Sequence, residues 1–152
     1  MFNSILTVCT GNICRSPIAE YLLKDLFISD NISIESAGIH AMKGFPADRT
    51  AHQIALDHGF DLSPHRARMI NEEMVKSNGL ILVMDKYHKE FINKNFPYVN
   101  GKVFLLGKWL DEKEILDPYQ KSLDFFKEVY SQIDRACKIW EVYIKEGITS
   151  AK

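Results

Sequence analysis

The sequence has few cysteines and no excess of charge of either sign. Only three of its 152 residues are cysteine, namely Cys9, Cys14 and Cys137. A small disulfide-stabilised domain needs a dense and usually even set of cysteines, so this number excludes such a scaffold and favours a reduced, cytoplasmic protein. Nineteen basic and 20 acidic residues give a formal net charge of −1. That balance argues against nucleic acid as a partner, because nucleic-acid-binding domains usually carry a basic excess.

Long apolar runs are also absent. No apolar stretch approaches the roughly 18 residues that a membrane-spanning helix needs, so we expect no membrane insertion. Residues 1–4 carry no basic segment and the apolar run 5–8 is too short for the core of a secretory signal, so we expect an intracellular protein. Apolar residues still make up 46% of the chain, which is ample for one core. The length fits one domain, which we expect to span residues 1–152.

The patterns that are present alternate between strand and helix. Short apolar runs predict four strands, at residues 5–8, 32–36, 79–84 and 102–106. Helical periodicity predicts five helices, at residues 16–27, 48–58, 71–77, 86–94 and 122–146. Such alternation indicates an α/β fold around a mainly parallel sheet. The continuous apolarity of the run 79–84 further suggests a strand that is covered on both faces.

Residues 8–17, which read VCTGNICRSP, carry the strongest chemical signal. Cys9 ends the first predicted strand, Arg15 follows after five intervening residues, and Ser16-Pro17 suits the start of a helix. Successive backbone N–H groups of a strand-to-helix turn can converge on a dianion, and a helix N-terminus adds favourable potential. Arg15 offers a planar pair of donors for two phosphate oxygens. The segment therefore predicts a loop that binds phosphate.

The other residues of this loop fit the same interpretation. We expect Gly11 to permit a backbone shape that a Cβ atom would obstruct, and Asn12 to tolerate left-handed angles. The positive potential of the loop favours a thiolate at Cys9, and the Ser16 hydroxyl could donate to that thiolate. Alone, Cys9 would sooner be read as a small buried residue at a strand end. The spacing of five residues between Cys9 and Arg15 instead favours a role for Cys9 as a nucleophile.

This segment resembles the signature of the low-molecular-weight protein tyrosine phosphatases, a Cys-x5-Arg-Ser loop near the N-terminus. Three further matches occur in the family's order: Ser36-Ala37-Gly38, Met84-Asp85 and Asp117-Pro118-Tyr119. The resemblance covers nearly the whole chain. It implies a single flavodoxin-like domain (phosphotyrosine phosphatase I-like), in which a four-stranded parallel sheet has helices on both faces. It also implies hydrolysis of phosphotyrosine through a phosphocysteine, with no metal and no organic cofactor.

The resemblance assigns catalytic roles to three residues. Cys9 is the expected nucleophile, Arg15 the phosphate clamp and Asp117 the general acid and then base. A phenolate is a poor leaving group, since tyrosine has a pKa of about 10, so an acid is needed. The expected substrate-binding residues are Thr10, Gly11, Asn12, Ile13, Cys14, Ser16 and Tyr119. Without the resemblance, Asp117-Pro118 would be read as a turn and Tyr119 as an ordinary half-buried tyrosine.

Supporting roles also come from the resemblance. Asn12, Ser36 and His65 match positions that hold the loop by hydrogen bonds, although His65 after Ser63-Pro64 equally suits a turn or helix cap. Tyr119 is expected in one aromatic wall of the substrate site, and Gln120 stands where some members carry a second aromatic. The opposite wall is expected from the segment after Gly38, which contains Ile39, His40 and Met42. His40 is expected to be solvent-exposed.

Cys14 and Cys137 have other expected roles. In this family a second loop cysteine can form a reversible disulfide with the nucleophile, which would pair Cys14 with Cys9; otherwise Cys14 only packs. Cys137 is expected in the core.

An arsenate reductase of the same fold would need further cysteines between Cys14 and Cys137, and none occurs there. A non-catalytic phosphotyrosine-binding module would need neither Cys9 nor Asp117.

Partners follow from the same comparison of motifs. The five histidines show no ligand spacing for a metal. The expected partner is a phosphotyrosine protein. The stretch 117–122 resembles the bacterial branch of the family, whose members often act on tyrosine autokinases of polysaccharide export.

Overall fold

The computed structural model describes residues 3–99 and 101–147, which form one parallel sheet between two layers of helices. The strands are β1 (Ser4–Cys9), β2 (Ser33–Gly38), β3 (Leu80–Val83) and β4 (Val103–Leu105). They pair in the order β2-β1-β3-β4, and all three pairings are parallel. The predicted single α/β domain with a four-stranded parallel sheet is confirmed. The expected bounds of that domain, 1–152, reach beyond the described residues.

The five helices lie where the periodicity predicted them, within two residues at each end. They are α1 (Arg15–Leu26), α2 (Arg49–Asp57), α3 (Glu72–Ser77), α4 (Lys86–Asn95) and α5 (Leu123–Lys145). The small shifts have a physical cause in the capping residues. The side chains of Asp48, Asn71 and Ser122 accept hydrogen bonds from the first turns of α2, α3 and α5, so these residues precede their helices.

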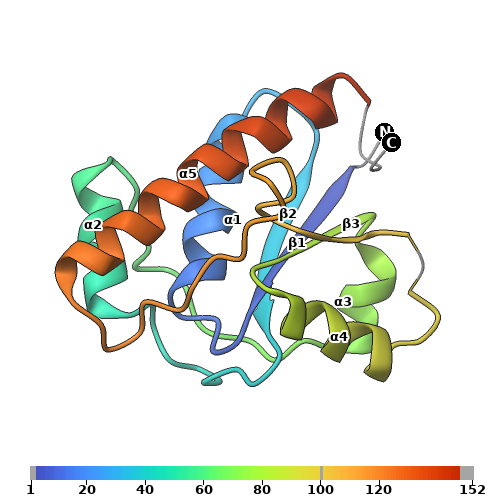
Figure 1. Ribbon diagram of the computed structural model, residues 1–152, viewed down its shortest axis with the longest axis horizontal. Coiled ribbons are helices and arrows are strands. Elements are labelled where there is room, and N and C mark those ends of the chain that lie inside the picture. The colour runs from blue at the N-terminus through green and yellow to red at the C-terminus, as the bar shows by residue number, and fades with distance from the viewer. Residues whose placement is uncertain (1–2, 100, 148–152) are drawn as a thin grey trace.

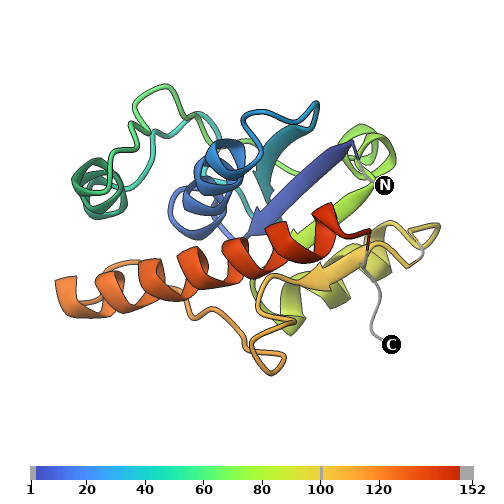
Figure 2. The ribbon, with the colours of Figure 1, turned by 90° about the horizontal axis from the view of Figure 1, so that it is seen from above.

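Helices cover both faces of the sheet because successive strand residues point to opposite sides. Ile5 and Leu82 pack against the layer that contains α1, α2 and α5. Leu6 and Val83 pack against the layer that contains α3 and α4. Figures 1 and 2 show these two layers on either side of the strands. The predicted coverage of β3 on both faces is therefore confirmed.

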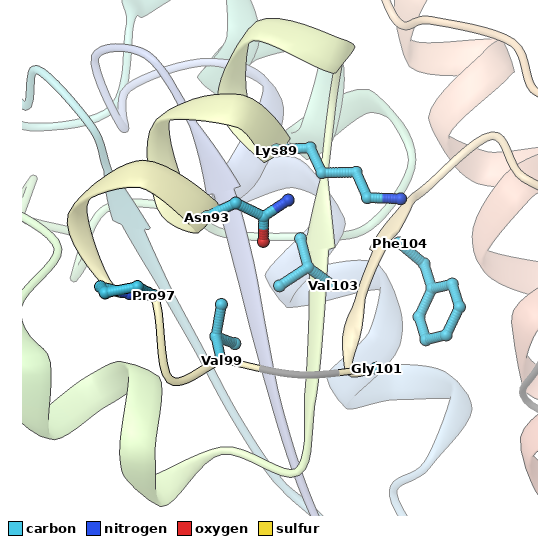
Figure 3. A pocket seen from close by; sticks show the side chains of 7 residues that line it. All are labelled: Lys89, Asn93, Pro97, Val99, Gly101, Val103 and Phe104. Carbon is cyan, nitrogen blue, oxygen red and sulfur yellow. The ribbon is translucent and has the colours of Figure 1, made fainter.

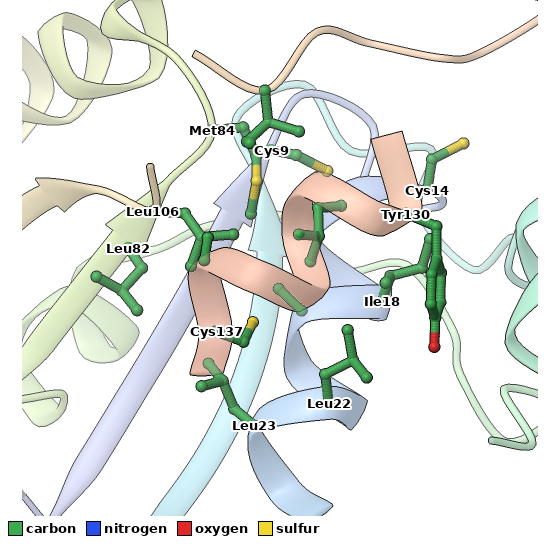
Figure 4. Packing of buried hydrophobic residues seen from close by; sticks show 14 of the residues in the cluster. Cys9, Cys14, Ile18, Leu22, Leu23, Leu82, Met84, Leu106, Tyr130 and Cys137 are labelled. Atoms are coloured by element: carbon green, nitrogen blue, oxygen red, sulfur yellow. The ribbon is translucent and has the colours of Figure 1, made fainter. Parts of the chain in front are cut away.

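The larger of the two layers is closed by α5. Figure 4 shows the side chain of Cys137 inside this cluster beside Leu22 and Leu23 of α1. Cys137 and Trp140 are fully buried, and the Trp140 indole donates to the carbonyl oxygen of Leu106 at 2.7 Å. The prediction that Cys137 belongs to the core is confirmed. None of the helices formed by residues 3–99 and 101–147 combines the length and apolarity needed to cross a membrane.

The order of the strands places a ligand site at the end of β1. From β1 the chain passes to β2 on one side, and β3 lies on the other side of β1. Open α/β sheets bind ligands at the carboxyl ends of strands where the strand order reverses in this way. Cys9 is the last residue of β1. A separate hollow of about 400 Å³ lies between α4 and β4, with Lys89 and Phe104 in its lining (Figure 3), and it includes no residue of the 9–16 loop.

Candidate active site

The 9–16 loop is turned so that its carbonyl groups face the segment between β2 and α2. The carbonyl oxygens of Cys9, Thr10 and Gly11 accept from the amides of residues 39, 40 and 42 at 2.9–3.0 Å. The carbonyl oxygen of Ile13 accepts from the Asp48 amide at 2.8 Å. Within the described residues, the amides of Gly11, Ile13 and Cys14 donate to no protein acceptor. A loop whose carbonyls are bonded on its outer side presents N–H groups on its inner side, where an anion can accept from them.

The Cys9 sulfur lies at the base of this loop and is surrounded by donors. The Asn12 amide donates to Cys9 Sγ at 3.3 Å, and Ser16 Oγ lies 2.9 Å from the same sulfur. Ser16 Oγ accepts from the Asn12 side-chain amide at 2.8 Å, and its own proton can point at the sulfur or at the Ala37 carbonyl oxygen, 3.5 Å away. Both groups are placed to donate hydrogen bonds to a negatively charged sulfur.

Arg15 is almost fully buried and is held by groups from distant segments. Its Nη1 donates to the Ile115 carbonyl oxygen at 2.7 Å and to Asp85 Oδ2 at 3.4 Å. Its Nη2 lies 3.8 Å from Asp117 Oδ2. The Asp117 side chain is half exposed, so this carboxylate stands at the mouth of the loop, where it can meet solvent and a ligand. Tyr119 is also partly exposed, and its amide donates to Asp117 Oδ1 at 3.1 Å.

The expected hydrogen-bond network behind the loop is present. Asn12 has a φ of 60°, and its side-chain amide donates to Ser36 Oγ at 3.0 Å. The His65 ring nitrogen Nε2 bonds to the Asn12 carbonyl oxygen at 2.6 Å. Burial lowers the pKa of His65, which favours the neutral ring. The prediction that His65 helps to hold the loop by a hydrogen bond is therefore confirmed. The left-handed conformation expected of Asn12 is confirmed as well.

Two members of this network were missed from the sequence. The Ser36 hydroxyl donates to Glu20 Oε1 at 2.6 Å, and the Arg68 amide donates to Asn12 Oδ1 at 2.8 Å. Glu20 is nearly buried in α1. An acidic residue among the apolar positions of a helix was a usable signal for Glu20. Arg68 gave no signal, because the contact uses only its backbone.

Two expectations about the site are wrong, one about the loop backbone at Gly11 and one about Ile39 as a residue of the wall. Gly11 lies outside the left-handed region, and an added Cβ atom would meet Met42 and Ile13 at the ordinary contact distances of 3.6 and 3.7 Å. The glycine beside the loop that has no space for a Cβ atom is Gly38, at the end of β2. Ile39 is fully buried in the cluster under α3 and α4, so it cannot line a wall. His40 is exposed, as predicted.

The cysteines are all free thiols or thiolates. Figure 4 shows Cys9, Cys14 and Cys137 at separate places, and none of the three is in a disulfide. Burial, together with the nearby Asp48 carboxylate, raises the pKa of the Cys14 thiol and keeps it protonated. A disulfide between Cys9 and Cys14 stays a prediction.

Comparison with known proteins agrees with this geometry. The family model for the low molecular weight phosphotyrosine protein phosphatase matches residues 4–149. The low molecular weight protein-tyrosine-phosphatase Etp of Escherichia coli K12 is 46% identical over 139 residues, which cover 91% of this chain and 93% of Etp.

Two solved structures are similar over nearly the whole chain. The tyrosine phosphatase Wzb from Escherichia coli K30 in complex with sulphate has a TM-score of 0.90 and 42% identity, and the match covers 95% of this chain and 99% of Wzb. Vibrio vulnificus Wzb in complex with benzylphosphonate has a TM-score of 0.89 and 38% identity, with 93% and 99% covered. Since sequence, fold and family model coincide across almost every described residue, this chain belongs to the low molecular weight protein-tyrosine-phosphatase family.

Proposed function

We propose that the protein hydrolyses phosphotyrosine through a phosphocysteine, with Cys9 as nucleophile, Arg15 as phosphate clamp and Asp117 as general acid and base. The observation that supports this most is the position of the Cys9 sulfur. It lies at the base of a loop whose bonded carbonyls face outward, and it is contacted by the Asn12 amide and the Ser16 hydroxyl. A dianion bound in that loop would have its phosphorus directly before the sulfur.

In the first step the Cys9 thiolate attacks phosphorus. The S–P bond forms while the bond from phosphorus to the tyrosyl oxygen breaks, and Asp117 transfers a proton to the departing oxygen. The loop amides and Arg15 stabilise the equatorial oxygens as their charge changes. Support for Asp117 as the acid is its half-exposed carboxylate, which lies 3.8 Å from Arg15 Nη2 at the mouth of the loop.

In the second step water hydrolyses the phosphocysteine. Water attacks phosphorus and gives its proton to Asp117, the S–P bond breaks, and inorganic phosphate leaves. The departing sulfur becomes a thiolate again. The Ser16 hydroxyl, 2.9 Å from Cys9 Sγ, is placed to stabilise that negative charge.

Two observations support an aryl phosphate as substrate. Cys9 is only 2% exposed, so a phosphate ester must reach down to it, which a tyrosyl side chain can do better than a short seryl one. Benzylphosphonate, the ligand named for Vibrio vulnificus Wzb, also carries an aromatic ring on its phosphonate. We place the Tyr119 ring in the wall that contacts the substrate, since this side chain is partly exposed beside Asp117.

The proposal extends to the protein substrate and to the cellular compartment in which the enzyme acts. The similarity to Etp and Wzb supports a bacterial phosphotyrosine protein as substrate, and a tyrosine autokinase of polysaccharide export is our candidate. Three free cysteines support a reducing cytoplasm as the site of action. The test incubates the reduced enzyme with a purified autophosphorylated autokinase. Rapid turnover of phosphotyrosine peptides with no loss of phosphate from the kinase would reject this partner alone.

The chemistry is tested on para-nitrophenyl phosphate and a phosphotyrosine peptide, with EDTA present and a phosphoserine peptide as a specificity control. We expect turnover by the native enzyme and essentially none by Cys9→Ser. Asp117→Asn should lose roughly 100- to 10,000-fold on the peptide and less on the nitrophenyl ester, whose better leaving group needs less protonation. Asp124→Asn, an exposed aspartate at the start of α5, is the matched control and should stay near native. Full activity of Cys9→Ser would reject the mechanism.

A further inference from the structure

His88 is a buried histidine that neither motif nor spacing connects to the site. It lies on α4 and is fully buried. Its Nδ1 accepts a hydrogen bond from the Asp85 amide at 3.2 Å, which caps the first turn of the helix. A ring nitrogen that accepts from an amide carries no proton, so the single ring proton sits on Nε2. Burial also lowers the pKa of His88 to about 4, so the ring is neutral at working pH.

The ring proton of His88 is directed at the 9–16 loop. Nε2 lies 2.9 Å from Thr10 Oγ1, and donates to it in this tautomer. The same oxygen accepts from Arg15 Nη2 at 3.3 Å. Because both neighbours donate to Thr10 Oγ1, the hydroxyl proton of Thr10 is left for a third partner. An anion in the loop is such a partner.

These contacts close into a ring of four residues, in which His88 and Asp85 are linked through their backbone amides. Arg15 bonds to Thr10, Thr10 to His88, and His88 to Asp85 through its ring and through its amide, which donates to Asp85 Oδ1 at 3.1 Å. Asp85 Oδ2 closes the ring by accepting from Arg15 Nη1 at 3.4 Å. The two terminal nitrogens of the guanidinium are therefore held by different partners. That arrangement fixes the plane of the group as well as its position.

We propose that His88 is a positioning residue for the phosphatase reaction. As a neutral donor it holds the Thr10 hydroxyl, which in turn orients Arg15 and directs its own proton toward the phosphoryl group. A neutral ring suits this task because a cation here would repel the Arg15 guanidinium. The inference rests on the proposed function and assigns a role that the loop signature does not contain. The competing role for His88 is purely structural: a helix cap that also fills the core.

Two substitutions at His88 separate these roles because the two ring nitrogens do different things. An asparagine amide reaches the place of Nδ1, so His88→Asn keeps an acceptor for the Asp85 amide and loses the donor to Thr10. A glutamine amide reaches the place of Nε2, so His88→Gln can keep the donor. We expect His88→Asn to lower kcat/KM by about 10- to 100-fold, the usual cost of leaving a buried hydrogen-bonding group without its partner, and His88→Gln to stay within about threefold.

Matched substitutions at Thr10 keep the inference testable if the buried histidine variants fold poorly. Thr10→Val keeps the shape and removes the hydroxyl, so it should match His88→Asn, whereas Thr10→Ser should restore activity. The inhibition constant of inorganic phosphate should rise in Thr10→Val and in His88→Asn. The double variant Thr10→Val with His88→Asn should be no worse than Thr10→Val alone, because both remove one connected contact.

The outcomes discriminate clearly. Equal losses in His88→Asn and His88→Gln, additive losses in the double variant, or native phosphate inhibition in Thr10→Val would each overturn the positioning role. The free energies of unfolding of the same variants, measured in urea, should not rank in the same order as their kcat/KM values. Full activity of Cys9→Ser would instead reject the proposed function. Cys9-dependent turnover that is unchanged across the Thr10 and His88 series would reject this inference alone.

Discussion

A Cβ atom on Gly38 would lie 2.5 Å from the carbonyl oxygen of Thr10. The end of β2 therefore touches the backbone of the 9–16 loop with no room for a side chain. Gly38 is also bonded on its other side, where its amide donates to the Arg68 carbonyl at 2.9 Å and its carbonyl accepts from the Ile70 amide at 2.9 Å. The position cannot move away without losing these bonds, so the loop and β2 hold each other in place.

Gly38→Ala should therefore damage the loop. We expect kcat/KM to fall by at least about tenfold and the free energy of unfolding to fall by roughly 1–3 kcal/mol, the usual cost of overpacking. Urea denaturation and phosphatase assays measure the two effects. Ser33→Ala, at the exposed start of the same strand, is the control and should change the unfolding free energy by less than about 0.5 kcal/mol. A Gly38→Ala enzyme with native activity and native stability would show that the loop is not held by this contact.

Substitutions of Asn12 should separate backbone strain from lost hydrogen bonds. Asn12→Ala removes the bonds to Ser16, Ser36 and the Arg68 amide, and leaves a residue with a Cβ atom at a φ of 60°. Asn12→Gly loses the same bonds but tolerates the angle, so it should be more stable than Asn12→Ala by about 1 kcal/mol. Both should be less stable than the native protein by urea denaturation. A native-like Asn12→Ala would contradict the importance of the network.

The two contacts of Glu20 should differ in strength because one is buried and the other is not. The Ser36 hydroxyl donates to Glu20 Oε1 at 2.6 Å in the interior, and Lys24 lies 2.7 Å from Oε2 with a half-exposed side chain. Ser36→Ala leaves a buried carboxylate oxygen without its donor and should cost about 1–3 kcal/mol of unfolding free energy. Lys24→Ala should cost less than about 1 kcal/mol. Equal costs in urea denaturation would be evidence against this distinction.

The stability of the protein should fall in mild acid because of His88. The pKa of His88 is lowered from 6.5 to about 4, chiefly by burial and to a smaller extent by the Arg15 and His40 charges, against the opposing effect of the Asp85 and Asp117 carboxylates. Between these values the unfolded chain binds a proton that the native protein does not. The stabilisation is therefore complete above pH 6.5 and is lost as the pH falls toward 4, by about 3 kcal/mol in total.

Urea denaturation at pH 7 and pH 4.5 measures this effect, with His88→Gln as the matched variant. The native protein should lose more stability between the two pH values than His88→Gln does. Some loss should remain in the variant, since burial also lowers the pKa of His65. Equal losses in the two proteins would show that His88 is not the titrating group.

Most of the fold could be predicted from local patterns in the sequence. The run 79–84 is apolar throughout because β3 is buried on both faces, and capping residues such as Asp48 and Ser122 mark helix starts. The second strand was predicted to end at residue 36 but continues to Gly38. Its last residues are held by contacts with the loop and with residues 68–70, which are distant in the sequence. Strand ends that depend on such pairing have no local signature.

The 9–16 loop could also be predicted, because it is a contiguous segment. Cys9, Arg15 and Ser16 lie within eight residues, and the chain direction from β1 into α1 is enough to bring them together. The wrong expectation for Gly11 shows the limit of prediction from a contiguous segment. Whether a Cβ atom fits depends on the neighbouring backbone, and at Gly11 the neighbours leave room.

The sequence by itself determined the class of fold, the loop and the cysteine that we propose as its nucleophile, because periodicity, capping and a short motif act between residues that are close in the chain. Only the tertiary structure decided how Arg15 is held and which buried polar groups support the loop. Asp85, His88 and the Ile115 carbonyl reach Arg15 or Thr10 from 70 or more residues away. Those hydrogen bonds exist because parallel strands end at one edge of the sheet, so the residues that follow them meet there wherever they lie in the sequence.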